Sequence, residues 1–87
     1  MGLFGKKYKE VEREIERTLR YMARSQREIV EGLTETYAKF LERISTSDIT
    51  TLTDEQIQRL YRMKDLLSNL RRRELTYLER IMEMLED

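Results

Sequence analysis

No residue pattern in this 87-residue chain is typical of a catalytic or metal-binding site. Histidine and cysteine are absent, which removes the usual general base, the thiol nucleophile and the preferred ligands of zinc. The closest group of carboxylates is Glu10, Glu12, Glu14 and Glu16. They face solvent beside basic partners, which is typical of surface ion pairs and not of a catalytic acid or base. The sequence therefore predicts a protein that is not an enzyme and that uses no metal, cofactor or small-molecule substrate.

Basic side chains recur at spacings of three and four in the first third of the chain, which places them on one face of a helix. This basic row consists of Lys6, Lys9, Arg13, Arg17, Arg20, Arg24 and Arg27. Residues 1–27 carry a net charge of +4, and residues 28–55 carry −5. Three interpretations stay open: a solvated face with ion pairs, sequence-independent contact with nucleic-acid phosphates, and staggered self-assembly of oppositely charged ends.

Two polar residues interrupt otherwise apolar series, Gln26 in the first half of the chain and Glu74 in the second. If a turn is centred near residues 49 and 50, residues that face each other across two antiparallel helices have numbers that sum to about 99. Gln26 and Glu74 then lie at nearly the same level along the helix axes. An amide can donate to a carboxylate, and Arg71 or Arg73 could approach from the flank. We expect the pair to fix the register of the helices. A ligand-binding or proton-handling carboxylate, or an exposed pair without a role, are the alternatives.

The first helix is expected to extend beyond the end of the second, which leaves residues 1–12 as an overhang. The residues in it that could contact a membrane or a partner are Leu3, Phe4, Lys6, Lys7 and Tyr8. Apolar groups beside lysines suit insertion at an anionic membrane surface or docking on another subunit. Fraying, or cover by a second copy of the chain, is the other interpretation.

The opening residues Met1-Gly2-Leu3-Phe4-Gly5-Lys6 resemble the start of some membrane-scission filament proteins of the ESCRT type. Those proteins continue into a long α-helical hairpin and use a short apolar N-terminus on membranes, which is what the resemblance implies for this chain. It covers six residues of common types. The first helix of that family is basic throughout, whereas this chain alternates acidic and basic residues.

The spacing of apolar residues predicts one long helix over about residues 5–45. Its stripe repeats in steps of four, four and three, close to the natural helical period. The stripe reads Val11, Ile15, Leu19, Met22, Gln26, Val30, Leu33, Tyr37, Leu41 and Ile44. Gly32, Thr34 and Thr36 are weak helix formers, but the phase of the stripe continues across them, so we expect an unbroken helix.

Residues 46–52 are predicted to form a turn, followed by a second helix over about residues 54–86. Thr53 is a natural N-cap with Gln56 as its capping-box partner, and Leu52 and Ile57 are spaced as a hydrophobic staple. The second helix then carries the series Leu60, Met63, Leu67, Leu70, Glu74, Tyr77, Ile81 and Met84, which Leu66, Leu78 and Leu85 widen.

Both apolar faces are wider than one neighbouring helix can cover. The fold class predicted for residues 1–87 is therefore all-α: one domain, a long antiparallel helical hairpin that dimerises into a four-helix bundle. The expected function is that of an adaptor or structural interaction protein, which binds itself and another protein. The alternatives are a nucleic-acid-binding bundle that uses the basic row, similar in architecture to the plasmid copy-number Rop-type regulators, and a membrane-surface assembly factor.

Composition adds expectations about location and source. No stretch has the roughly 20 apolar residues needed to span a bilayer, and no apolar core follows the first basic residues as in a secretory signal. We therefore expect a cytoplasmic protein. Charged residues make up 39% of the chain, and their enrichment is typical of proteins from hot environments. The small size and plain composition are compatible with a viral or plasmid origin.

Overall fold

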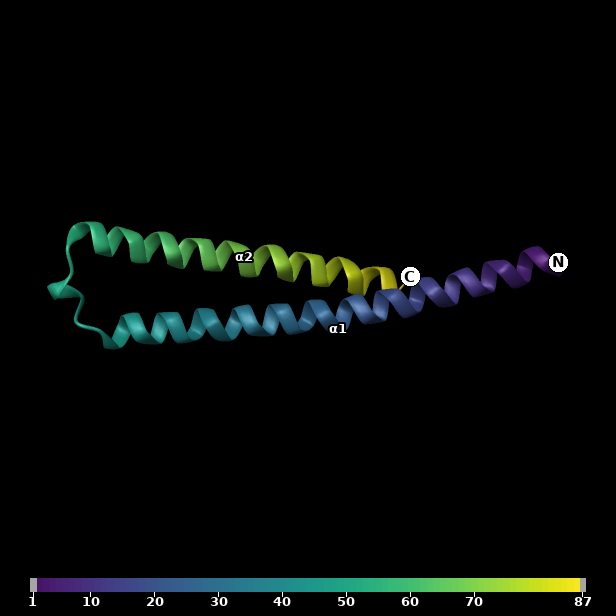
Figure 1. Cartoon of the computed structure of the whole chain (residues 1–87), viewed down its shortest axis with the longest axis horizontal. Coiled ribbons are helices and arrows are strands. Elements are labelled where there is room, and N and C mark those ends of the chain that lie inside the picture. The colour runs from purple at the N-terminus through teal and green to yellow at the C-terminus, as the bar shows by residue number, and fades with distance from the viewer. Residues whose placement is uncertain (1, 87) are drawn as a thin grey trace.

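Two long helices and a short turn make up the structure, a computed structural model (Figure 1) that describes the backbone of residues 2–86 and the side chains of residues 7–86. Helix α1 spans Gly2–Thr46, a short 3-10 helix η1 spans Ile49–Thr51, and helix α2 spans Asp54–Glu86. The molecule is a single layer that measures 74 × 18 × 14 Å. The all-α hairpin is as predicted, although α1 begins three residues earlier than expected.

Helix α1 is continuous through Gly32, as its uninterrupted apolar stripe predicts. The hydroxyls of Thr34 and Thr36 donate to the carbonyls of Val30 and Gly32, both at 2.8 Å. These bonds keep the hydroxyls within the helix instead of letting them compete with its backbone hydrogen bonds. The weak helix formers are therefore accommodated without a break.

Side-chain hydrogen bonds define the turn. At the end of α1, the hydroxyls of Ser45 and Ser47 donate to the carbonyls of Glu42 and Arg43, at 2.8 and 2.6 Å, and so add side-chain bonds to the last turn of the helix. Asp48 accepts bonds from the amide of Thr50 at 3.1 Å and from its hydroxyl at 2.5 Å. The bond from the hydroxyl and, to a smaller extent, the bond from the amide hold the pKa of the Asp48 carboxyl below its usual value.

Helix α2 begins at the predicted capping box. The amide of Thr53 donates to Gln56 Oε1 at 3.0 Å, and the amide of Gln56 donates to Thr53 Oγ1 at 3.2 Å. Leu52 and Ile57, on either side of the cap, are half-buried. Each bond satisfies a backbone donor at the start of the helix, which explains why α2 begins where the sequence predicts.

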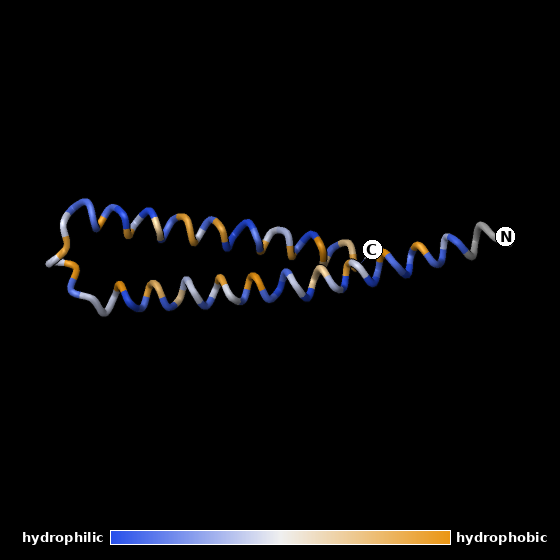
Figure 2. Tube along the Cα trace, in the orientation of Figure 1, coloured by the Kyte–Doolittle hydropathy of each residue, from blue (hydrophilic) through white to orange (hydrophobic). Residues whose placement is uncertain are grey.

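Hydrophobic residues follow the inner edges of both helices (Figure 2), yet the described part of the chain buries few of them. The buried side chains are Leu19, Ala23, Val30 and Ile81. Leu19, Ala23 and Ile81 form a cluster with the partly buried Met82 and Leu85. The small Ala23 side chain permits a close approach of the helices there, and towards the turn they diverge (Figure 1).

Candidate interaction surfaces

Gln26 and Glu74 meet between the helices. Gln26 Nε2 donates to Glu74 Oε2 at 2.6 Å and to the Glu74 carbonyl oxygen at 2.8 Å. Arg73 Nη2 lies 3.3 Å from Glu74 Oε1, and 17% of the Glu74 side chain is exposed. The bond from Gln26, with a smaller contribution from Arg73, holds the pKa of Glu74 below its usual value of 4.5. A lowered pKa is the opposite of what a neutral-pH proton donor needs, so this geometry favours a structural role.

Two further side chains cross from one helix to the other. Arg71 Nε donates to Thr34 Oγ1 at 2.7 Å, and Arg27 Nη2 lies 3.9 Å from Met82 Sδ. Of the two flanking partners expected for Glu74, Arg71 and Arg73, it is Arg73 that takes this place, whereas Arg71 bonds to Thr34. At 100° per residue, the two crossing contacts lie on the same side of the hairpin, which we call the polar side.

The described members of the basic row, from Lys9 to Arg27, are all exposed, and all but Arg27, which reaches across to Met82, lie along the outside of α1. Arg17 pairs with Glu14 at 3.5 Å and Arg20 pairs with Glu16 at 2.6 Å, both through well-exposed side chains. Exposed helix pairs of this kind contribute little to stability, about 0.3–0.5 kcal/mol each. The Lys6 side chain lies outside the described residues.

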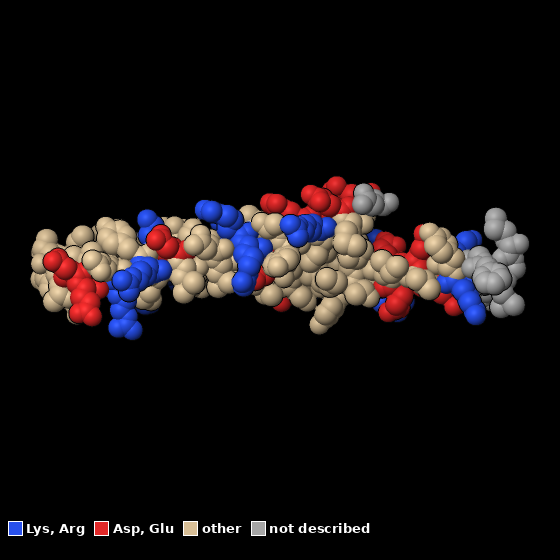
Figure 3. All heavy atoms as spheres, turned by 90° about the horizontal axis from the view of Figure 1, so that it is seen from above, with Lys and Arg blue, Asp and Glu red and all other residues tan. Residues whose placement is uncertain are grey.

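Across the hairpin, α2 offsets the uneven charge of α1. Residues 73–86 carry two basic and four acidic residues beside the basic half of α1, and residues 56–72 carry five basic and one acidic beside its acidic half. Seen from the α2 edge, groups of both signs are interspersed along the molecule (Figure 3). The opposite net charges of the two halves of α1 are therefore largely offset where α2 lies beside them, and a local excess of one sign remains only at the overhang and around the turn.

The overhang continues α1 past the end of α2 (Figure 1). Its described side chains Lys7 and Tyr8 are exposed, Tyr8 by 65%, whereas Leu3, Phe4 and Lys6 lie outside the described side chains. A hollow where the overhang meets the end of α2 is lined in part by Tyr8, Val11 and Met84. Among the described residues of the overhang, the apolar groups of Tyr8 and Val11 are thus more than half exposed.

Large apolar side chains are exposed along both helices. Eight of them lie on what we call the apolar side, namely Val11, Ile15, Met22 and Ile29 of α1 and Met63, Leu66, Tyr77 and Met84 of α2, each between 43% and 70% exposed; Tyr21, Leu41 and Tyr61 are exposed on other faces. Around the axis of each helix, the residues of the apolar side lie about 70° from the residues that face the other helix, and the direction of this rotation is the same on α1 and α2. Because the helices are antiparallel, equal displacement places both series on one side of the hairpin, opposite the polar side.

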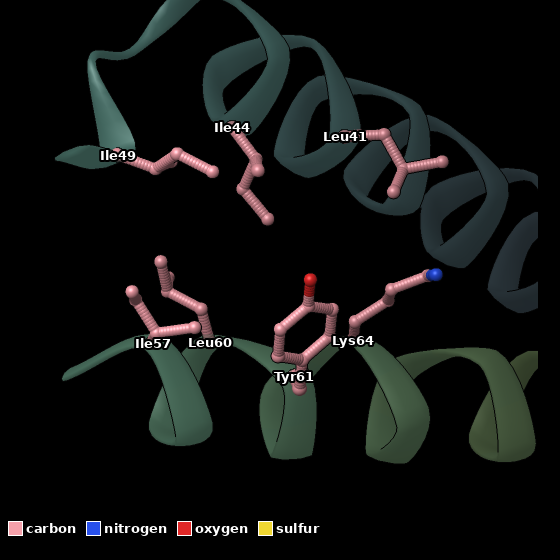
Figure 4. A pocket seen from close by; sticks show the side chains of 7 residues that line it. All are labelled: Leu41, Ile44, Ile49, Ile57, Leu60, Tyr61 and Lys64. Carbon is pink, nitrogen blue, oxygen red and sulfur yellow. The ribbon is translucent and has the colours of Figure 1, made fainter. Parts of the chain in front are cut away.

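Near the turn, where the helices diverge, apolar pockets open. One of about 130 Å³ lies between Leu41 and Ile44 of α1, Ile49 of η1, and Leu60 and Tyr61 of α2 (Figure 4). Another hollow, of about 670 Å³, is lined in part by Phe40, Ile44 and Leu60. The apolar stripes predicted from the sequence include Leu41, Ile44 and Leu60 but not Phe40, Ile49 or Tyr61, and they give no signal that bulky side chains would hold the helices apart here. The repeat of Ile15, Met22 and Ile29 at intervals of seven could have revealed the apolar side.

Among the described residues, no group of histidine, cysteine or carboxylate side chains is arranged to hold a metal ion. No helix in that part of the chain is long and apolar enough to cross a membrane. Comparison with protein-family models, curated proteins and solved structures finds no match for this chain. The functional argument therefore depends on the surfaces themselves.

Proposed function

We propose that this protein is a non-catalytic helical hairpin that dimerises through its apolar side into a four-helix bundle and acts as an adaptor for another protein. The observation that carries the proposal is the contrast between this side, with eight large apolar residues exposed by 43–70%, and the four buried side chains of the described core. A small domain with so little buried surface is marginal by itself. A second copy would cover the exposed groups.

The apolar side is large enough for a stable dimer. The 33 residues of α2 extend over about 50 Å at a rise of about 1.5 Å per residue, and the hairpin is 18 Å wide. Contact along this length would bury about 900 Å² on each chain, or about 1,800 Å² in total, which is in the range of specific interfaces. Hydrophobic burial on this scale is the main driving force of association.

Dimerisation can be tested by following helix unfolding with circular dichroism at several protein concentrations. A dimer that loses its helices when it dissociates has a melting temperature that rises with concentration. A melting temperature that is independent of concentration, with a cooperative transition and full helical signal, would contradict the proposal.

Nucleic-acid binding is the second candidate, since the outward-facing basic row has members without a partner. Arg13 and Arg24 are exposed and have no carboxylate oxygen within 4.0 Å among the described residues. The row points away from the apolar side, so a dimer would leave it accessible on both chains. Arginines in such a row suit phosphate contacts that do not depend on sequence.

Fluorescence anisotropy with a labelled duplex tests this second candidate. The double variant Arg13→Glu/Arg24→Glu should weaken binding and flatten its dependence on salt. Lys39→Glu/Arg72→Glu makes the same change of charge on exposed residues outside the row and serves as the control. Equal binding by both variants, or binding that is insensitive to salt, would rule out phosphate recognition by the row.

Cytoplasmic location, and binding of the overhang to a membrane surface, remain predictions from the sequence. The overhang proposal can be examined by sedimentation with anionic vesicles, comparing the intact protein with one that lacks residues 1–9. Equal sedimentation of both would exclude the overhang as a membrane anchor.

A further inference from the structure

We infer that the second copy of the chain lies antiparallel to the first, so that residues 7–15 of each α1 seat on the turn end of the partner. This inference rests on the proposed dimerisation and adds the topology of the dimer. Two arrangements bring the apolar sides of two hairpins together. In the parallel one both turns lie at the same end and α1 packs on the partner's α2. In the antiparallel one the turns lie at opposite ends, α1 packs on α1, and α2 packs on α2.

The middle of the bundle does not distinguish the two arrangements. Within the hairpin, neighbours have numbers that sum to about 100, as Gln26 and Glu74 do. A parallel dimer with this spacing would bring Met22 opposite Tyr77. An antiparallel dimer with its twofold axis near residue 25 would bring Met22 opposite Ile29, which also buries apolar surface on both sides. The choice therefore depends on the ends of the molecule.

At the ends, exposed apolar groups and hollows are complementary in the antiparallel arrangement. Val11 is 55% exposed on the overhang, and the hollow of about 670 Å³ beside Phe40 lies at the turn end of the same side. A twofold axis near residue 25 places Val11 opposite Phe40 of the second copy and Tyr8 opposite its hollow. It also places Met63 opposite Met84, which are 49% and 57% exposed. A parallel dimer would leave each overhang without α2 beside it and each turn-end hollow uncovered.

Charge favours the same arrangement at these ends. Residues 1–13 carry four basic and two acidic residues, a net of +2, and residues 46–55 carry three acidic residues and no basic one, a net of −3. The antiparallel dimer places each positive segment beside a negative one. The parallel dimer places the two positive segments side by side and the two negative segments side by side, which is unfavourable.

The polar pair acquires a role in this geometry. An axis near residue 25 passes at the height of Gln26 and Glu74, so the two polar layers of the dimer meet at its centre. Ser25, which is small and half-buried, lies at the same height and permits close approach of the two α1 helices. A polar layer at the symmetry axis specifies one register, since a slipped register would separate the two layers.

The absence of cysteine from the sequence makes the topology accessible to labelling. A spin label at Ser47→Cys should report an interchain distance of about 65 Å in the antiparallel dimer, because about 22 residues at about 1.5 Å each separate it from the axis on either side. An interchain distance below about 30 Å, set by helix spacings of about 10 Å, would establish the parallel dimer and overturn the inference while leaving dimerisation intact. A monomeric mass would remove the proposed function, and the inference with it.

Disulfide formation gives a second, independent test. Residues 11 and 40 of one chain are about 44 Å apart along α1, so they cannot form a disulfide within that chain. Under mild oxidation, Val11→Cys/Phe40→Cys should form a covalent dimer, and neither single variant should. Cross-linking of Val11→Cys alone as fast as the double variant would overturn the inference. The inference would also be overturned if the thiol of Val11→Cys reacted freely with a labelling reagent in the dimer and became protected only when anionic vesicles were added. The overhang would then bind lipid instead of the second copy.

Discussion

Replacing Leu66 by alanine should weaken the dimer without unfolding the helix. Leu66 is 70% exposed in the hairpin, so about two thirds of its surface remains for a partner to bury. Burying a whole leucine side chain contributes about 1.5–3 kcal/mol, so the partner's share is about 1–2 kcal/mol per chain and about 2–4 kcal/mol per dimer. This corresponds to a dissociation constant roughly 30- to 1,000-fold higher. Alanine is at least as good a helix former as leucine, so helical propensity is retained.

The matched control is Tyr21→Ala. Tyr21 is also 70% exposed, but it lies about 90° around α1 from the centre of the apolar series, toward the outer edge of the helix. Sedimentation velocity over a dilution series measures the dissociation constant of both variants, and circular dichroism of the concentrated samples measures their helical content. We expect a weakened dimer for Leu66→Ala and an unchanged one for Tyr21→Ala. Equal effects of the two substitutions, or an undisturbed Leu66→Ala dimer, would refute the assignment of the apolar side as the interface.

Three other substitutions test the fold, all by thermal or chemical unfolding. Gly32→Ala should stabilise the protein by about 0.5–1 kcal/mol, since an added Cβ meets no atom within 4 Å and alanine favours the helix. Thr53→Ala should cost about 1 kcal/mol, because it removes the N-cap of α2. The pKa of Glu74 is lowered on folding, so its stabilising contribution is complete above about pH 4.5 and is lost as the pH falls through the folded value. Glu74→Gln should therefore lose less stability than the original protein between neutral and acidic pH, and an identical pH dependence would show that this contact is not important.

Local patterns in the sequence predicted much of the fold. The capping box at Thr53 and Gln56 places the start of α2, because the two residues satisfy backbone donors that any helix start leaves free. The same apolar phase on both sides of Gly32 identifies α1 as one helix, since a break would have shifted that phase. The alignment of Gln26 with Glu74 across the hairpin followed from the position of the centre of the turn.

Features that depend on the packing of both helices could not be predicted in this way. The divergence near the turn depends on the volumes of facing side chains, with Ala23 at the close contact and bulky residues such as Phe40 and Leu60 towards the turn. The charges of α2 compensate those of α1, but this can be recognised only when it is known which residues of the two helices lie beside each other. Arg71 bonds to Thr34 rather than to Glu74, a choice of side-chain rotamer that spacing does not determine.

The mass of the protein in solution tests self-association most directly. Sedimentation equilibrium at concentrations used for spectroscopy should give a mass near twice the 10.6 kDa of one chain. On dilution this mass should decrease, and the helical signal should decrease with it. A mass of 10.6 kDa at every concentration, with helices that remain formed and melt cooperatively, would show that a single hairpin is stable with its apolar side in water.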